Sequence, residues 1–434
     1  MIEVLKIIKF SFFKIWLIML WFLLALSPNL NADTLGEVLR LTFSSNKQLL
    51  LSRTQLQSSK TAIDISKSAL GLNFSASING STGWNINEST KSDSYSSSLT
   101  GSYNISDGNL SKSKVLIDEA LYKISKLQVR ELEQKVLLDT INAYLNVLRD
   151  QKFVELSNNN VVVLERQFLE IKDRFQLGEV TRTDVAQAES ALAAAKANLT
   201  AKIGSLKISS ELFLSLVGIK PYKLMNIKIN FKLPTTIEIA KKKSLKTHTK
   251  IMAAKIEEQI ARIRIDITKS QKSPLINFKS IFSNGYSSSS GNNNSVTFRL
   301  EGSIPIFNSG KIDSEIKQAK INYKAQKEST LLVKRLVEQD IALAWSNVLV
   351  SKASIEARKR QVESSSLAYD GVVVEEKLGT RTTLDVINAE QSLLDARTQL
   401  ASAERELTYA RFALLAATGE LNLKKLNIAD PKIN

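Results

Sequence analysis

Two parts of the chain alternate apolar and polar residues with the two-residue period of a β-strand. In the first part, Tyr95, Leu99 and Tyr103 fall on one face, while Ser and Thr residues fall on the other. A two-residue period places successive side chains on opposite faces of a strand. Because each part also contains a central stretch rich in Ser and Asn, we expect two β-hairpins, over 71–106 and 275–306.

Long segments without proline follow both hairpins and predict helices. Over 111–177 and 311–378, apolar residues recur every three or four positions, as in Leu138, Ile141 and Leu145. At a rise of 1.5 Å per residue, each helix would be roughly 100 Å long. Helices of this length predict an elongated molecule rather than a compact domain.

The segments that follow these helices, 182–217 and 383–418, carry heptad repeats. In the second segment Val386, Leu393 and Leu400 share one heptad position, and alanines share the other. Such repeats specify left-handed coiled-coil packing. We therefore expect each of these segments to form a coiled-coil helix.

The two halves of the chain resemble each other. At an offset of 201 residues, the sequence AYLNVL at 143–148 matches AWSNVL at 344–349. Similarity at a fixed offset indicates an internal repeat. We expect a first repeat over 33–234 and a second over 235–434, each built from a helix, a β-hairpin, a long helix, a coiled-coil helix and a closing segment.

Residues 1–32 are typical of a secretory signal peptide. Lys6, Lys9 and Lys14 accompany an apolar run of about a dozen residues at 15–26. A membrane-spanning helix needs about 20 apolar residues. We therefore favour a cleaved signal peptide over a membrane anchor.

The composition argues against catalysis. The chain has no Cys and a single histidine, His248, so a thiol nucleophile, a Cys metal site and a multi-His metal site are excluded. We expect no enzymatic activity, no cofactor and no metal site. The net charge of +16 could attract nucleic acid. The lysines are spread among many acidic residues, however, and with a secretion signal we expect no nucleic-acid partner.

The predicted hairpins match membrane strands in length and in having one apolar face. Four strands cannot close a barrel, which takes about eight or more, and open sheet edges are not tolerated in lipid. Several subunits would have to combine their strands, and a trimer would supply twelve. The alternative is a periplasmic or secreted coiled-coil structural protein whose hairpins pair in solution.

Two motifs carry a resemblance to a known family. They are FQLGEVTRTDV at 175–185 and KLGTRTTLDV at 377–386, each followed by heptads rich in Ala and Leu. Together with the duplicated order of elements, they make the chain resemble the TolC-type outer-membrane efflux and secretion channels, the outer membrane factors. The resemblance implies a membrane α+β fold, in which a homotrimer forms a 12-stranded transmembrane β-barrel continued by a periplasmic α-helical coiled-coil barrel. The segments 222–234 and 421–434 would belong to its equatorial collar.

The same resemblance implies a function and partners. Such a channel is the exit duct of a tripartite efflux pump or a type I secretion system. It would lie in the outer membrane of a Gram-negative bacterium, contact outer-membrane lipid and extend into the periplasm. Its partners would be a periplasmic adaptor (membrane fusion protein), which opens the periplasmic tip, and an inner-membrane transporter.

The resemblance also assigns residues to the tip. The turns at Gly178 and Gly379 would form its end. Arg381 in the second turn would hold the tip shut through Thr183 and Asp184 in the first.

An acidic constriction would include Asp385 and the neighbouring Asn388, with Glu376 and Glu390 as further sources of negative charge. Asp385 and its counterpart Asp184 also occupy the last position of capping-box patterns. Both are therefore expected as helix caps, as gate residues, or in both roles.

Two charged residues stand out on the polar face of the second hairpin. Arg299 and Glu301 alternate with apolar neighbours, and we expect them to line the lumen of the barrel. A pair on a sheet surface facing bulk water is the alternative.

Overall fold

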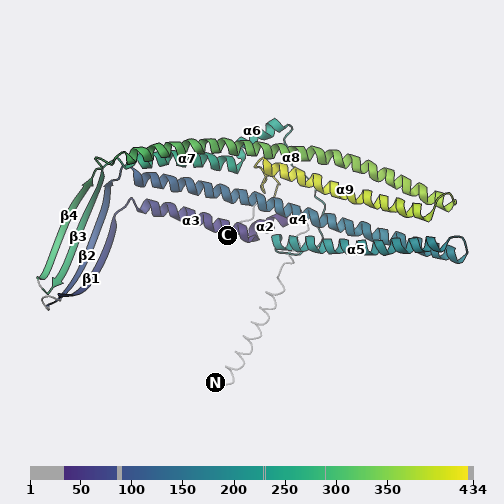
Figure 1. Cartoon of the computed structure of the whole chain (residues 1–434), viewed down its shortest axis with the longest axis horizontal. Coiled ribbons are helices and arrows are strands. Elements are labelled where there is room, and N and C mark those ends of the chain that lie inside the picture. The colour runs from purple at the N-terminus through teal and green to yellow at the C-terminus, as the bar shows by residue number, and fades with distance from the viewer. Residues whose placement is uncertain (1–33, 86–89, 228, 230, 289, 429–434) are drawn as a thin grey trace, which may run out of the picture.

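The computed structural model describes residues 34–85, 90–227, 229, 231–288 and 290–428. The expected signal peptide lies outside these residues. A four-stranded sheet occupies one end of an elongated molecule, and two helical hairpins form the other end (Figure 1). In chain order the elements are α2 (Leu35–Ser45), α3 (Lys47–Ser68), β1 (Asn73–Asn85), β2 (Thr90–Ser106), α4 (Leu110–Gln176), α5 (Arg182–Val217), α6 (Ile237–Thr247), α7 (Thr249–Ser270), β3 (Leu275–Ser287), β4 (Gly291–Ser303), α8 (Lys311–Lys377) and α9 (Thr383–Ala417).

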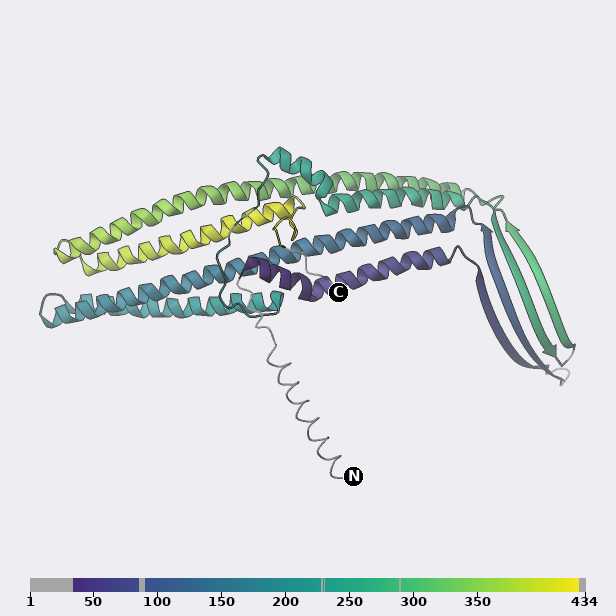
Figure 2. The same ribbon diagram turned by 180° about the vertical axis from the view of Figure 1, so that it is seen from behind.

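Two long helices, α4 and α8, run along the whole helical part of the molecule (Figure 2). Each has 67 residues. Helices α3 and α5 pack along α4, and α7 and α9 pack along α8. The second half therefore has the same element order as the first. No helix in the described part of the chain combines the length and apolar character needed to cross a membrane.

The helix expected before each β-hairpin is in fact two helices. The break between α2 and α3 falls at Asn46, whose side chain accepts hydrogen bonds from the backbone N–H groups of Gln48 and Leu49 at 3.0 and 3.2 Å. The break between α6 and α7 falls at His248, whose Nδ1 accepts from the N–H of Lys250 at 3.3 Å. A side chain that caps a new helix start lets the chain change direction there.

The four strands form one antiparallel sheet in the order β1-β2-β3-β4. The register places Leu99 of β2 opposite Ala76 of β1 and Phe282 of β3. Because paired residues share a face, one face of the sheet is apolar and carries Phe74, Ala76, Ile78, Tyr95, Leu99, Tyr103, Phe278, Phe282, Tyr286, Val296, Phe298 and Leu300. The other face is mainly Ser, Thr and Asn.

The strand ends differ from the expected ones. β4 ends at Ser303 rather than at 306, because Pro305 has no N–H to donate to a neighbouring strand. The Ser- and Asn-rich stretches expected as loops, 84–93 and 287–295, are partly paired strand. Trp84 pairs with Lys91, and Asn292 pairs with Tyr286.

The main apolar core lies at mid-length, where α2, α4, α5 and α9 meet the segments that follow α5 and α9. Tyr144 and Phe213 are fully buried there, with ring centroids 6.5 Å apart. The Tyr144 hydroxyl donates to the Met225 carbonyl at 2.7 Å. This bond ties the irregular segment after α5 to the long helix.

We expect Phe213→Ala to destabilise the helical part by about 3–5 kcal/mol, because it leaves a cavity in this core. Thermal unfolding of the purified protein measures the effect. The neighbouring Leu212 is exposed, so Leu212→Ala is the matched control and should leave the midpoint nearly unchanged. Equal midpoints for the two variants would contradict the assigned core.

Candidate functional site

The two helical hairpins end in turns of the same geometry at the end far from the sheet (Figure 1). Gly178 and Gly379 both have φ of +79°, a conformation that costs other residues free energy. The N–H of Gly178 donates to the Phe175 carbonyl at 3.0 Å, and that of Gly379 donates to the Glu376 carbonyl at 2.8 Å. Each glycine thus ends one helix and reverses the chain.

The next helices begin with complete capping boxes. The Asp184 N–H donates to the Thr181 hydroxyl at 3.2 Å, and the Thr181 N–H donates to the Asp184 carboxylate at 2.9 Å. The same two distances recur between Thr382 and Asp385. The hydroxyl and N–H of Thr181 lower the pKa of Asp184, and the N–H and hydroxyl of Thr382 lower that of Asp385. Both aspartates are therefore helix caps.

Within one chain, no hydrogen bond or ion pair among the described residues joins Arg381 to Thr183 or Asp184. Its Nε donates to the Glu375 carboxylate at 2.9 Å, within its own hairpin. The two side chains meet because the tight turn brings residues on either side of Gly379 together. Thr183 and Asn388 are both exposed.

An ion pair that sequence reasoning missed joins the two hairpins near their ends. Arg174 of α4 donates through Nη1 to the Glu376 carboxylate of α8 at 2.6 Å, and through Nε to Glu179 at 3.3 Å. The hydrogen bond that Arg174 donates to Glu376 is the largest cause of the raised pKa of Arg174. Arg174 lies four residues before Gly178 and Glu376 three residues before Gly379, so the repeat does not pair them, and their opposite charge was the only sequence signal.

A second link between the hairpins is buried. Asn160 of α4 donates to the Glu390 carboxylate of α9 at 3.2 Å, and the two residues are only 4% and 6% exposed. Apolar packing of Val161 and Leu192 against Ile387 lies beside it. Glu390 is thus engaged inside the bundle and Glu376 is paired with Arg174, so neither is a free carboxylate at the tip.

On the sheet, Glu301 lies between two cations. Lys279 Nζ is 2.8 Å from its carboxylate, and Arg299 Nη1 is 3.4 Å from it. The register places Lys279 directly opposite Arg299. Sequence reasoning omitted Lys279, although its position beside the apolar-face residue Phe278 assigns it to the polar face.

The model of a protein family, described as outer membrane efflux protein, matches residues 38–218 and 241–420. The chain belongs to the outer membrane efflux protein family. It is 28% identical over 361 residues to the outer membrane efflux protein BepC of Brucella suis, covering 77% of this chain and 79% of that protein. It is 26% identical over 373 residues to the outer membrane protein TolC of Escherichia coli, covering 82% and 75%.

Solved structures share the fold. A CusC structure superposes with a TM-score of 0.80 at 16% identity and covers 89% of this chain and 92% of that one. The open state of the MtrE outer membrane channel of Neisseria gonorrhoeae gives a TM-score of 0.76 at 19% identity, with 89% of both chains covered.

This outer membrane efflux protein is an outer-membrane exit duct for efflux or type I secretion. It lies in the outer membrane of a Gram-negative bacterium and extends into the periplasm. The family and its structural neighbours are channels rather than enzymes. Family membership thus favours the channel over the coiled-coil structural protein.

The capping boxes predict that the stability of the first turns of α5 and α9 depends on pH. Because the folded-state pKa values of Asp184 and Asp385 are lowered, their stabilisation is complete above the ordinary pKa of an aspartate. It is lost as the pH falls through the lowered values. Amide hydrogen exchange, corrected for intrinsic rates, should therefore be faster in the first turns of α5 and α9 at about pH 2 than at about pH 5.

Asp385→Asn supplies the control for this measurement, since an asparagine cannot titrate. In this variant, amide exchange in the first turn of α9 should no longer depend on pH. Exchange in the first turn of α5, which Asp184 caps, should keep its pH dependence. An unchanged pH dependence in α9 would show that the Asp385 cap is not its cause.

Proposed function

We propose that three copies of the chain form one channel, in which their sheets close a 12-stranded transmembrane β-barrel. Each chain contributes a sheet whose outer strands, β1 and β4, have one neighbour each among the described residues. Unpaired backbone groups are not tolerated in lipid, so β1 of one subunit pairs with β4 of the next.

The two faces of the sheet support this assembly. Apolar side chains such as Ile78 and Phe298 are 88% and 71% exposed in the single chain, and they face lipid in the barrel. Lys279, Arg299 and Glu301 lie on the opposite face, and they line the lumen.

The proposal for the periplasmic part rests on a difference in burial between the two long helices. Nineteen residues of α4 are buried in the single chain, but only four residues of α8 are. Exposed apolar residues along α8 include Leu332, Leu343 and Val350. A large exposed apolar surface marks an interaction site. Neighbouring subunits cover it, and the six helical hairpins of the trimer form the coiled-coil barrel.

The tip is the gate of this channel. Within each subunit, Arg174–Glu376 and Asn160–Glu390 hold the hairpins together. Arg381 reaches Thr183 and Asp184 of a neighbouring subunit, and Asp385 and Asn388 lie at the constriction.

Weak links suit a gate that has to open. An exposed ion pair, such as the proposed one between Arg381 and Asp184 of a neighbouring subunit, contributes about 0–1 kcal/mol, so a threefold set of these pairs contributes a few kcal/mol at most. A periplasmic adaptor that binds the open state more tightly by a similar amount shifts the population to the open form. An inner-membrane transporter then delivers cargo into the duct.

The link between the hairpins predicts a change in conductance. Arg174→Gln removes the charge that pairs with Glu376, so it should raise the single-channel conductance in planar bilayers. The matched control is Lys196→Gln, because Lys196 pairs with Glu165 inside the first hairpin, at 3.4 Å. If the conductance rises equally in both variants, or does not rise in either, Arg174 is not a gate residue.

The exposed apolar surface of α8 predicts an effect on assembly. Light scattering of the purified wild type in detergent should give the mass of a trimer. Leu343→Glu combined with Val350→Glu places charges in the proposed interface and should shift the protein towards monomers. Lys352→Gln, an exposed position on the same helix, should remain trimeric. A monomeric wild type, or a trimeric double variant, would refute this interface.

A further inference from the structure

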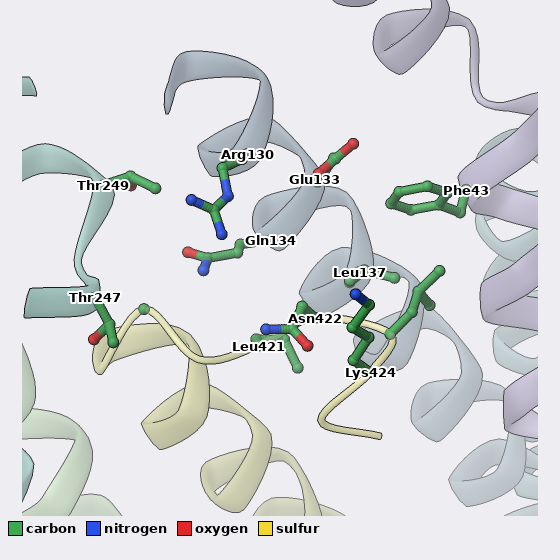
Figure 3. Close-up of a pocket in the computed structure, with 12 residues that line it drawn as sticks. Phe43, Arg130, Glu133, Gln134, Leu137, Thr247, Thr249, Leu421, Asn422 and Lys424 are labelled. Atoms are coloured by element: carbon green, nitrogen blue, oxygen red, sulfur yellow. The ribbon is translucent and has the colours of Figure 1, made fainter. Parts of the chain in front are cut away.

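A cavity of about 390 Å³ lies at mid-length between the two halves of the chain. Its walls come from α4, from the junction of α6 and α7, and from the segment that follows α9 (Figure 3). Small-molecule sites have volumes of roughly 300–1,000 Å³. The cavity is therefore large enough for a small ligand.

The surroundings of the cavity carry excess positive charge. Arg130 and Lys424 line it, and Lys246 and Lys425 line the adjoining hollow. Among the residues that the structure describes, none of these four cations has a carboxylate within ion-pair distance.

Two carboxylates also line the site, Glu133 in the cavity and Glu420 in the adjoining hollow, but each is paired with another cation. Glu133 pairs with Arg53 at 3.1 Å, and Glu420 pairs with Lys243 at 2.6 Å. Neither Arg53 nor Lys243 is one of the four cations that surround the cavity. Within the described residues, the positive charge of the site is therefore left without a carboxylate partner.

The polar groups of the cavity converge. Figure 3 shows the Arg130 guanidinium and the side-chain amides of Gln134 and Asn422 pointing into the same space, with Thr247 and Thr249 across from them. A guanidinium presents a planar fork of N–H donors that matches a carboxylate or phosphate. The side-chain amides supply further donors, whereas the Thr247 hydroxyl already donates to the Thr418 carbonyl at 2.8 Å.

The turn that carries Asn422 and Lys424 has a fixed position. Gly419 precedes it with φ of +73°, and a Cβ at this position would lie 2.8 Å from the Cα of His248. Leu421 and Leu423 are buried beneath the turn. The donors are therefore held by packed backbone.

We propose that this cavity binds the oxoanion group, a carboxylate or a phosphate, of a small soluble molecule in the periplasm. Arg130 is 20 residues along α4 from Leu110, which places it about 30 Å from the sheet. That distance separates the site from lipid headgroups. A bound anion bridges α4 of the first half, the α6–α7 junction of the second half and the C-terminal segment.

The only histidine of the chain is a reporter beside the cavity. His248 is buried between the lining residues Thr247 and Thr249. Burial, and then the charge of Lys250, lower its pKa, while Asp340 opposes them. An anion bound in the cavity adds negative charge near the ring, so it should raise the His248 pKa.

The test uses the full-length channel in detergent, purified through a histidine-free tag and carrying isotope-labelled histidine. Inorganic phosphate and an acidic tetrapeptide with free carboxylates are titrated separately, by calorimetry and by the pH titration of the histidine ring signal. The probe that binds distinguishes a phosphate ligand from a carboxylate ligand. Saturable binding of either probe, with an upward shift of the His248 pKa, is the expected result.

Variants locate the binding. Arg130→Gln combined with Lys424→Gln should weaken the affinity at least about tenfold, since both remove charged donors. Lys324→Gln, an exposed lysine of α8, should leave the affinity unchanged. Absence of binding by both probes at millimolar concentration would overturn the proposal. Equal affinity of the double variant and the wild type would do the same.

Discussion

Backbone N–H and C=O groups inside a lipid bilayer need hydrogen-bond partners, and this requirement governs the whole molecule. The sheet has one apolar face, but within the described chain its outer strands β1 and β4 each pair on one side only. With the sheet placed in lipid as proposed, a single copy is incomplete. The proposed trimer pairs these edges, and the helices that continue from the strands are then arranged around the same axis.

The two halves share their element order but differ in packing. Both α4 and α8 have 67 residues and end in turns of the same geometry. Helix α4 contacts α7 and α9 of the second half in addition to α3 and α5, so it is the buried centre of one subunit. Helix α8 keeps an exposed apolar surface. Under the proposed assembly, this difference lets one helix stabilise the subunit and the other form the interface.

Local patterns in the sequence were enough to predict the long elements and the turns. The helix expected over 111–177 spans Leu110–Gln176, because its apolar period is regular and no proline interrupts it. Gly178, Asp184 and their counterparts follow from motifs a few residues long. Strand ends were less predictable, because Ser-rich segments have no apolar alternation, yet Ser81 pairs with Ser94 across the strands.

Contacts between distant segments could not be predicted in this way. Arg174 meets Glu376 only because the first hairpin packs against α9 of the second near the tip, and no local pattern reveals that approach. The same is true of Arg130 and Asn422, which come from different halves of the chain and line one cavity. The capping roles of Asp184 and Asp385 were within reach of the sequence, whereas the partner of Arg381 in one chain, Glu375, was not anticipated.

The central claim is that the two hairpins of a subunit have to separate at the tip for the duct to open. Because the chain has no native Cys, Arg174→Cys with Glu376→Cys can be joined by a reducible bis-thiosulfonate reagent. A second pair, Glu165→Cys with Lys196→Cys, lies within one hairpin and is the control. The measurement is export by cells and conductance in bilayers, before and after reduction. The account predicts that the cross-link between hairpins stops export and keeps the conductance low until it is reduced, while the control link has no effect. Normal export through the linked channel would contradict it.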